Sequence, residues 1–389
     1  MIKNIKLEFI VFLLSLMIVI NYVTMFAFYN NYLGKIVIPF YFIILLLFIF
    51  KDPKDYIVFK ISIIIIGVIS LGTPTTEWDA WAIWLFHAKR IFFEENFFAT
   101  LDSYTFLHND YPLIAPAFSV SLVQFIGGWN EIFPKFSFFL IFIPPLLFSL
   151  KIFNEKFNFI FLIMTIFILN EFILNGYLDG LISIYFTFSL YFIYKIFIGE
   201  KDNFINFLTL FCFLIILSLL KNEGFVLTLI ILSFIFVNNI LIKKKYNFFI
   251  KKNIIFLSIL PYLAWRFICI KNGLTTDVIS DADFSRFANF NYFYETFIII
   301  SNYLIFNLQF VVCLVIFILS FYLNKNKKIL FLVLYCSFTY LIILFLIYFT
   351  TPHDLVWHLK TSSLRTMLVI KYVFCFFALI NFSNKELKF

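Results

Sequence analysis

Long apolar stretches separated by short polar breaks constrain what this chain can fold into. The stretches run for roughly 16 to 22 residues, the length that an α-helix needs to cross a bilayer core of about 30 Å. Of the 389 residues, 63% are hydrophobic and only 13% are charged, about half the charged fraction of an ordinary soluble domain. Because backbone polar groups must be satisfied inside a bilayer, the sequence predicts an all-α, polytopic membrane protein.

About twelve such spans are predicted, at residues 8–29, 36–50, 57–72, 132–150, 157–174, 181–198, 204–220, 225–242, 253–270, 300–323, 329–349 and 367–382. Segment 111–128 is apolar as well, but it starts with Tyr-Pro and ends with Gly-Gly, which indicates a re-entrant or juxtamembrane element. Residues 1–389 are therefore expected to form a single transmembrane domain, in which residues 73–128 make a large loop with juxtamembrane helices. No separate soluble domain is expected.

The lysines predict how the spans are oriented. They collect in alternate breaks, namely Lys51–Lys54, Lys151–Lys156, Lys195–Lys201, Lys243–Lys252, Lys325–Lys328 and Lys385–Lys388. Because basic loops stay in the cytoplasm, both termini are expected there, in a multi-pass protein of the plasma (inner) membrane. The remaining breaks, including the long loop 73–113, then lie on the extracytoplasmic side.

All histidines and arginines fall on that extracytoplasmic side. They are His87, His108, His353, His358, Arg90, Arg266, Arg286 and Arg365. A general preference of arginine for membrane interfaces is one explanation, but it does not account for the use of one face only. A site that needs titratable groups and planar, anion-binding guanidinium groups accounts for it better.

The long loop begins with a stretch compatible with an amphipathic helix along the membrane surface. Its polar residues are Glu77, Asp79, His87, Lys89 and Arg90. Helical spacing places Trp78, Trp81 and Leu85 on one stripe, and Asp79 on nearly the same face as Arg90. Interfacial anchoring explains the tryptophans but not the carboxylate, so the pattern favours a chemical role for Asp79.

Three shorter segments add polar candidates on the same side. His108 to Tyr111 precede a proline-stiffened return to the membrane, Asp179 follows a tight turn, and Lys221-Asn-Glu223-Gly joins two apolar stretches. A loop cap, a helix cap and a hairpin turn are the ordinary explanations. Each segment is equally able to supply a charged group or a ring to a shared site.

The last polar segment runs from Thr351 to Arg365 and is predicted to be a helix, with Thr351 at the cap and Pro352 at its first position. His353 lies near its start, and one face carries Asp354, His358, Thr361, Ser362 and Arg365. Solvation of an exposed face would explain this stripe. A polar stripe that ends in arginine also suits a phosphate or diphosphate.

Several classes of site and function are disfavoured. The five cysteines are scattered in apolar runs without metal-ligand spacing, so no disulfide and no structural metal are expected. Charges near span centres, which a pump or transporter would show, are almost absent, because Glu171 and Lys135 lie near span ends. The net charge of +8 comes from loop lysines and does not indicate a nucleic-acid partner.

Taken in order, these motifs resemble those of the GT-C superfamily of membrane glycosyltransferases, which includes protein O-mannosyltransferases and lipid A aminoarabinose transferases. The resemblance rests on Glu77-Trp-Asp79-Ala-Trp, Tyr111-Pro-Leu, Gly176-Tyr-Leu-Asp179, Lys221-Asn-Glu223-Gly, His353-Asp-Leu-Val-Trp-His358 and Ser363-Leu-Arg365. Together these motifs cover most of the predicted extracytoplasmic face.

The resemblance implies an inverting enzyme that moves a sugar from a polyprenyl-phosphate carrier to a hydroxyl of a glycan, lipid or protein. Asp79 would be the general base, and Asp179 and Glu223 would orient the substrates. Arg365 would offset the charge of the leaving phosphate, assisted by other substrate-binding residues, which are Glu77, His87, Lys89, Arg90, His108, Tyr111, Lys221, His353, Asp354 and His358. A divalent metal on Glu77 and Asp79 is compatible with the sequence, although nothing in the spacing demands it.

Two alternatives stay open. A ligase or polymerase of lipid-diphosphate-linked glycans would also use arginine and histidine on this face, but it needs no carboxylate base. A flippase or transporter of lipid-linked sugars would need polar residues along a path through the spans.

Overall fold

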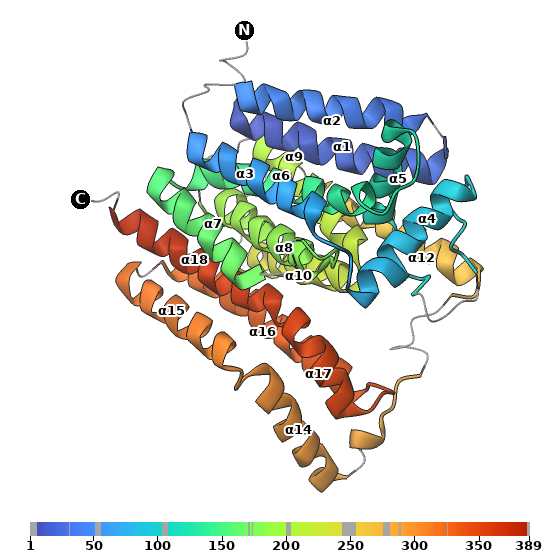
Figure 1. The fold of residues 1–389 in the computed structure, drawn as a ribbon. Coiled ribbons are helices and arrows are strands. Elements are labelled where there is room, and N and C mark those ends of the chain that lie inside the picture. The colour runs from blue at the N-terminus through green and yellow to red at the C-terminus, as the bar shows by residue number, and fades with distance from the viewer. Residues whose placement is uncertain are drawn as a thin grey trace.

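The structure is a computed structural model that describes residues 6–30, 32–50, 56–102, 108–169, 172, 174–199, 204–242, 254–274, 281–287, 289–324 and 326–386. Within these residues the chain is helical and forms no β-strand (Figure 1), so the predicted all-α fold class is confirmed. The predicted cytoplasmic breaks Lys51–Lys54 and Lys243–Lys252 lie outside the described residues.

The helices follow the predicted apolar stretches closely. In the first half they are α1 (Leu7–Ala27), α2 (Leu33–Phe50), α3 (Ile57–Gly72), the π-helix η2 (Asp79–Trp84), α4 (Leu85–Phe93), α5 (Ile114–Ile126), α6 (Phe133–Ile152), α7 (Glu155–Leu169), α8 (Asp179–Ile193) and the π-helix η5 (Tyr194–Gly199). The second half comprises α9 (Phe204–Leu220), α10 (Asn222–Ile242), η6 (Ile254–Ile259), α12 (Leu260–Lys271), η7 (Ser285–Phe287), α14 (Phe290–Leu304), α15 (Leu308–Asn324), α16 (Lys327–Phe349), α17 (Leu355–Thr366) and α18 (Leu368–Glu386).

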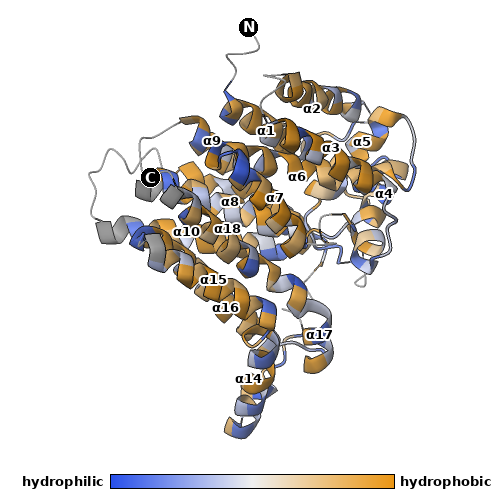
Figure 2. Ribbon diagram, turned by 60° about the vertical axis from the view of Figure 1, so that its left-hand side comes forward, coloured by the Kyte–Doolittle hydropathy of each residue, from blue (hydrophilic) through white to orange (hydrophobic). Residues whose placement is uncertain are grey.

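Several of these helices are suited to a membrane. By length and composition, six of the described helical stretches are long and apolar enough to cross a bilayer, or up to seven if the bent pair α14 and α15 counts as one span. Apolar residues cover the helices along their length (Figure 2). On α3, for example, the exposed residues include Ile61, Ile64, Ile65, Val68 and Ile69. Such exposed apolar surface indicates contact with lipid. The protein is therefore multi-pass, whereas the count of twelve spans stays a prediction.

The core is built around α9, which packs against α1, α8 and α10. The short helix α5 is buried along most of its length between α2, α4 and α6. It is therefore an internal element and is shorter than the predicted full spans, as the flanking Tyr-Pro and Gly-Gly suggested.

A pair of prolines inside α6 shows how the packing compensates for lost backbone hydrogen bonds. Pro144 and Pro145 have no N–H, so they cannot donate to the carbonyls of Leu140 and Ile141 one turn earlier. Tyr41 of α2 donates its hydroxyl to Leu140 O at 2.6 Å, and Tyr185 of α8 donates to Ile141 O at 2.8 Å. Two neighbouring helices therefore supply the donors that the prolines remove.

Two features were not predicted for the spans. Predicted span 300–323 is divided into α14 and α15, which meet at 69°, because Asn307 caps a new helix by accepting from the backbone N–H of Gln309 at 3.0 Å. A buried charge also lies within a span. Lys371 of α18 is buried and donates to Gln309 Oε1 at 3.1 Å; it lies in the first turn of the helix, so the expectation of almost no charge near span centres stays a prediction.

The ends of the bundle differ in what they carry. In Figure 1 the C-terminus lies at the left of the view and the N-terminus above the bundle, left of its centre, whereas α4 and α12 lie at the right and α17 at the lower right. The segments that the sequence analysis selected for chemistry therefore gather at the end of the helices opposite the termini.

Candidate active site

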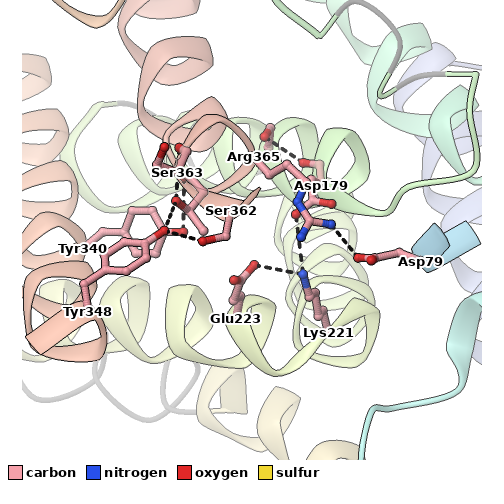
Figure 3. Close-up of polar contacts among 11 residues, drawn as sticks. Asp79, Asp179, Lys221, Glu223, Tyr340, Tyr348, Ser362, Ser363 and Arg365 are labelled. Atoms are coloured by element: carbon pink, nitrogen blue, oxygen red, sulfur yellow. Dashed lines mark hydrogen bonds and ion pairs between the residues drawn. The ribbon is translucent and has the colours of Figure 1, made fainter. Parts of the chain in front are cut away.

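Asp79 and Arg365, which are 286 residues apart, form an ion pair at the centre of the candidate site (Figure 3). Arg365 Nη1 lies 2.5 Å from Asp79 Oδ2, and the two side chains are 19% and 14% exposed. A charge-assisted hydrogen bond in partly buried surroundings is stronger than one at an open surface. The first loop and the last polar segment are therefore joined by the two residues given the main chemical roles.

Local sequence positions each partner. Asp79 opens η2, and Gly176 lets the turn before α8 approach this helix, since a Cβ at Gly176, where φ is +91°, would lie 2.8 Å from Ala80 Cβ. Arg365 lies in the last turn of α17, where the helix dipole favours a positive charge. That turn also places the guanidinium carbon 4.9 Å from the centre of the Tyr177 ring, a cation–π contact.

Tyr177 lies near both Arg365 and a second predicted residue, Glu77. Arg365, Asp79 and Glu77 lie close enough to the Tyr177 hydroxyl for their charges to act on it. Burial raises the pKa of Tyr177 to about 12, so the phenol stays protonated at neutral pH. Its ring and its O–H donor are thus available beside the ion pair, although the sequence analysis gave Tyr177 no role of its own.

Lys221 forms the second half of the cluster. It lies in the one-residue connection between α9 and α10, with its Nζ 3.6 Å from both Asp179 Oδ1 and Glu223 Oε2. Lys221 and Asp179 are buried, at 8% and 3% exposure. Burial alone would lower the pKa of Lys221, but the two carboxylates outweigh burial and raise it above its ordinary value. Lys221 is therefore a fixed positive charge at neutral pH.

An aromatic stack joins Lys221 to the first loop. The Tyr111 ring stacks on Trp84 at 5.5 Å and on His108 at 4.7 Å, and Lys221 Nζ lies 5.9 Å from the Tyr111 ring centre. Burial raises the pKa of Tyr111, which keeps its hydroxyl neutral. Tyr111 and His108 thus form an aromatic stack beside the Lys221 ammonium.

The buried carboxylate of Asp110 supports this stack; the sequence analysis considered its segment, His108 to Tyr111, but gave Asp110 no individual role. Asp110 accepts from Asn222 Nδ2 at 2.7 Å and lies 3.3 Å from Arg266 Nη1, while its carbonyl accepts from Trp265 Nε1 at 2.9 Å. Asn222 stands between Lys221 and Glu223, so this network fixes the hairpin that carries them. The position of Asp110 between His108 and Tyr111 was the available signal in the sequence.

The other basic residues of the first loop make separate contacts. Arg90 pairs with Glu94 at 2.8 Å and with Asp102 at 2.6 Å, while Lys89 pairs with Glu131 at 2.9 Å. The expectation that Asp79 and Arg90 share a face assumed 3.6 residues per turn. The wider turns of the π-helix η2 change that register. For the same reason Trp78 and Trp81 are exposed, whereas Leu85 is buried.

His87 is buried in the loop rather than open to substrate. Its Nε2 lies 3.1 Å from Asn109 Oδ1, which requires the Nε2–H tautomer for a hydrogen bond. Burial lowers the pKa of His87 to about 4, so the ring is neutral at pH 7. This contact ties α4 to the segment that carries Asp110 and Tyr111.

The last polar segment begins later than predicted. The helix α17 starts at Leu355, with Asp354 as the cap that accepts from the backbone N–H of Trp357 at 2.8 Å, so the assignment of Thr351 and Pro352 to the helix start was wrong. His358 Nδ1 lies 2.7 Å from Thr351 Oγ1, and the His353 ring lies 5.8 Å from the His358 ring. Of the predicted stripe, Arg365 is the residue that reaches Asp79.

Several hydroxyl-bearing side chains lie beside the charged cluster, on the side of α16. Figure 3 shows Tyr340 and Tyr348 directed towards the α17 residues Ser362 and Ser363. The Tyr348 hydroxyl lies 2.8 Å from Ser362 Oγ. These contacts hold α17 against α16 and thereby help to fix Arg365.

The residues present do not favour a divalent metal at Asp79. Its carboxylate already faces a guanidinium group, which competes with a cation for the same oxygens. Across the described ranges, no group of three or more His, Cys, Asp or Glu side chains is arranged to hold a metal ion.

Comparisons with known proteins identify no relative of this chain. The chain matches no protein-family model, no curated protein and no solved structure at the level required of a match.

Proposed function

We propose that the protein is an inverting membrane glycosyltransferase of the GT-C type, which moves a sugar from a polyprenyl-phosphate carrier to an acceptor hydroxyl on the extracytoplasmic face. The observation that carries the proposal is the ion pair of Asp79 with Arg365 at one end of a lipid-exposed helical bundle. A carboxylate and a guanidinium group are the base and the phosphate ligand that such a transfer needs.

The proposed reaction is a single displacement at the anomeric carbon. Asp79 accepts the proton of the acceptor hydroxyl while that oxygen forms a bond to the anomeric carbon. The bond from this carbon to the phosphate oxygen breaks, and polyprenyl phosphate leaves with the electron pair. Arg365 offsets the negative charge that develops on the leaving oxygen. Attack from the opposite side inverts the anomeric configuration.

Because Asp79 is paired with Arg365, binding of the donor phosphate to Arg365 would also release the proposed base. Asp79, Asp179 and Glu223 carry three negative charges against the two positive charges of Lys221 and Arg365. The cluster thus has no excess positive charge to attract an incoming phosphate. The phosphate therefore has to displace a carboxylate from Arg365. Displacement of Asp79 frees its oxygens to accept a proton, so the base becomes available when the donor is bound.

Lys221 supports this arrangement at short range. Its buried ammonium holds Asp179 and Glu223 in place, and these carboxylates are the proposed hydrogen-bond acceptors for sugar or acceptor hydroxyls. Tyr177 and Tyr111 add planar surfaces beside the two cations. The predicted twelve spans, the cytoplasmic termini and the extracytoplasmic site belong to the same proposal.

A comparison of two donors tests the reaction class. The purified protein is supplied with the same radiolabelled sugar on polyprenyl monophosphate and on polyprenyl diphosphate, together with extracted membrane lipids and glycans as acceptors. Transfer from the monophosphate with inversion supports the proposal. Transfer from the diphosphate alone would instead assign the protein to the ligase or polymerase class.

A further inference from the structure

An apolar groove lies between α2, α3 and α6 on the lipid-exposed side of the bundle. It has a volume of about 240 Å³, and its lining includes Phe48, Ile64, Gly67, Leu71 and Phe139. Gly67 lets α3 pack closely against α6 at the base of the groove, since a Cβ at this position would lie 3.0 Å from the Phe139 ring. The groove matches a hydrocarbon chain in its chemistry.

A larger hollow begins where this groove ends. It has a volume of about 690 Å³ and is lined by the end of α3, one face of η2 and α4, and the segment before α6. Leu71 lines both spaces, and Ile132 of the hollow lies one turn from Phe136 of the groove. The two spaces therefore follow each other along α3 towards the end of the bundle that carries Asp79.

The hollow adds polar groups and indole rings to an otherwise apolar lining. Trp81, Trp129, Lys89 and Glu131 are among its lining residues, together with Thr73 and Thr75. Lys89 Nζ lies 2.9 Å from Glu131 Oε1 and 5.8 Å from the Trp129 ring centre, and Trp129 Nε1 donates to the same Glu131 oxygen at 3.1 Å. The Trp81 side chain is exposed.

The charges of the hollow indicate which head group it takes. Among the residues that line the hollow, Lys89 and Glu131 carry the charges and pair with each other, so this lining presents no net positive charge to an anionic phosphate. Their ion pair is exposed and therefore weak, which leaves donors and an acceptor free to exchange with hydroxyl groups. Indole faces attract the C–H groups of a pyranose ring through their quadrupole. These features favour an uncharged saccharide.

We infer that the groove and the hollow together bind a lipid-linked saccharide, with its chain along α3 and its sugar between Trp81 and Trp129. Trp81 and Asp79 both belong to η2, so the hollow lies against the helix that carries the proposed base, although the two side chains leave that helix from different faces. Its assignment as the acceptor rests on the proposed function, whereas its binding does not.

Photolabelling of the purified protein in nanodiscs tests this inference. One probe is an alkyl glucoside with a diazirine on its chain next to the head group, and the other is an alkylphosphocholine with the same chain and diazirine. Labelled peptides are identified by mass spectrometry in wild type, Trp81→Ala, Trp129→Ala and Trp357→Ala. Trp357 is the matched control, because it is as exposed as Trp81, at 56% against 53%, but lies on α17.

The expected result is preferential labelling of residues 71–89 and 129–136 by the glucoside probe. Loss of one stacking ring should reduce that labelling about fivefold in Trp81→Ala and in Trp129→Ala, and Trp357→Ala should match wild type. Equal labelling by both probes would overturn the inference, because the hollow would then accept any lipid head group. Labelling that is insensitive to both tryptophan variants would overturn it as well.

The outcome is separable from that of the proposed function, because labelling requires no transfer. Selective labelling without any sugar transfer would leave the saccharide site standing and remove the acceptor role. Transfer without selective labelling would remove the saccharide site and leave the proposed function standing.

Discussion

Replacing Lys221 by methionine should lower the free energy of unfolding, because the carboxylates beside it would lose their ion-pair partner. The substitution keeps a similar length but removes the ammonium that lies 3.6 Å from both Asp179 and Glu223. Asp179 is 3% exposed and would lose its ion-pair partner, keeping only the longer-range attraction of Arg365. Breaking a buried ion pair in this way costs about 3–5 kcal/mol of unfolding free energy. A surface pair would cost less than about 1 kcal/mol.

The cost can be converted into a melting temperature. An unfolding entropy of about 2 cal/mol/K per residue gives about 0.8 kcal/mol per degree for this chain, so Lys221→Met should melt about 4–6 °C below wild type. Differential scanning fluorimetry in detergent measures this shift. Lys89→Met, which breaks an exposed pair, is the control and should melt within about 1 °C of wild type.

A second variant decides whether the carboxylate left without Lys221 is the cause. Asp179→Asn combined with Lys221→Met removes both charges, so it should recover more than half of the loss. If the double variant melts as low as Lys221→Met alone, the destabilisation comes from lost packing and the electrostatic account is refuted.

Three further predictions concern single contacts. Tyr41→Phe removes the donor to the Leu140 carbonyl that Pro144 cannot serve, so it should cost about 1–3 kcal/mol in unfolding free energy, and a melting temperature equal to wild type would contradict this. For His87, the folded pKa of about 4 lies below the unfolded value of about 6.5, so the unfolded chain binds more protons in that window and stability should fall as pH drops from 6.5 to 4. His87→Gln should flatten that part of the melting curve against pH, and an unchanged slope would contradict the assignment. Arg365→Lys keeps the charge but loses the planar fork, so its kcat/KM for sugar transfer should fall about 10- to 100-fold, and activity equal to wild type would argue against phosphate binding by the guanidinium group.

The fold was largely predictable because the apolar stretches report directly on helices. Each predicted span overlaps one helix or two consecutive helical segments, because a helix satisfies its own backbone hydrogen bonds within an apolar run. The break between α14 and α15 was missed because its clearest mark is a single asparagine, Asn307, which caps the second helix. Lys371 was overlooked because one lysine in an apolar run scarcely changes its hydropathy, although its burial makes it structurally distinctive.

The site was predictable in its parts but not in its pairings. The motifs selected Asp79, Lys221 and Arg365, but residues 286 positions apart carry no mark in a single sequence that they are partners. The register of the first loop was wrong because η2 is a π-helix, which no residue pattern there announced. Asp110 was missed because its importance comes from burial against Asn222 and Arg266, a property of packing rather than of a local motif.

Sugar transfer by Asp79→Asn tests the central claim most directly. The variant keeps the shape of the side chain and can still face Arg365, but it cannot accept a proton. Wild type, Asp79→Asn and Glu94→Gln, a control for loss of a carboxylate in the same loop, are compared for transfer of labelled sugar from synthetic polyprenyl phosphate after each is shown to be folded. The account predicts that Asp79→Asn lowers kcat about 100- to 10,000-fold and that Glu94→Gln matches wild type. A rate for Asp79→Asn equal to that of wild type would contradict the account and favour a reaction that needs no carboxylate base.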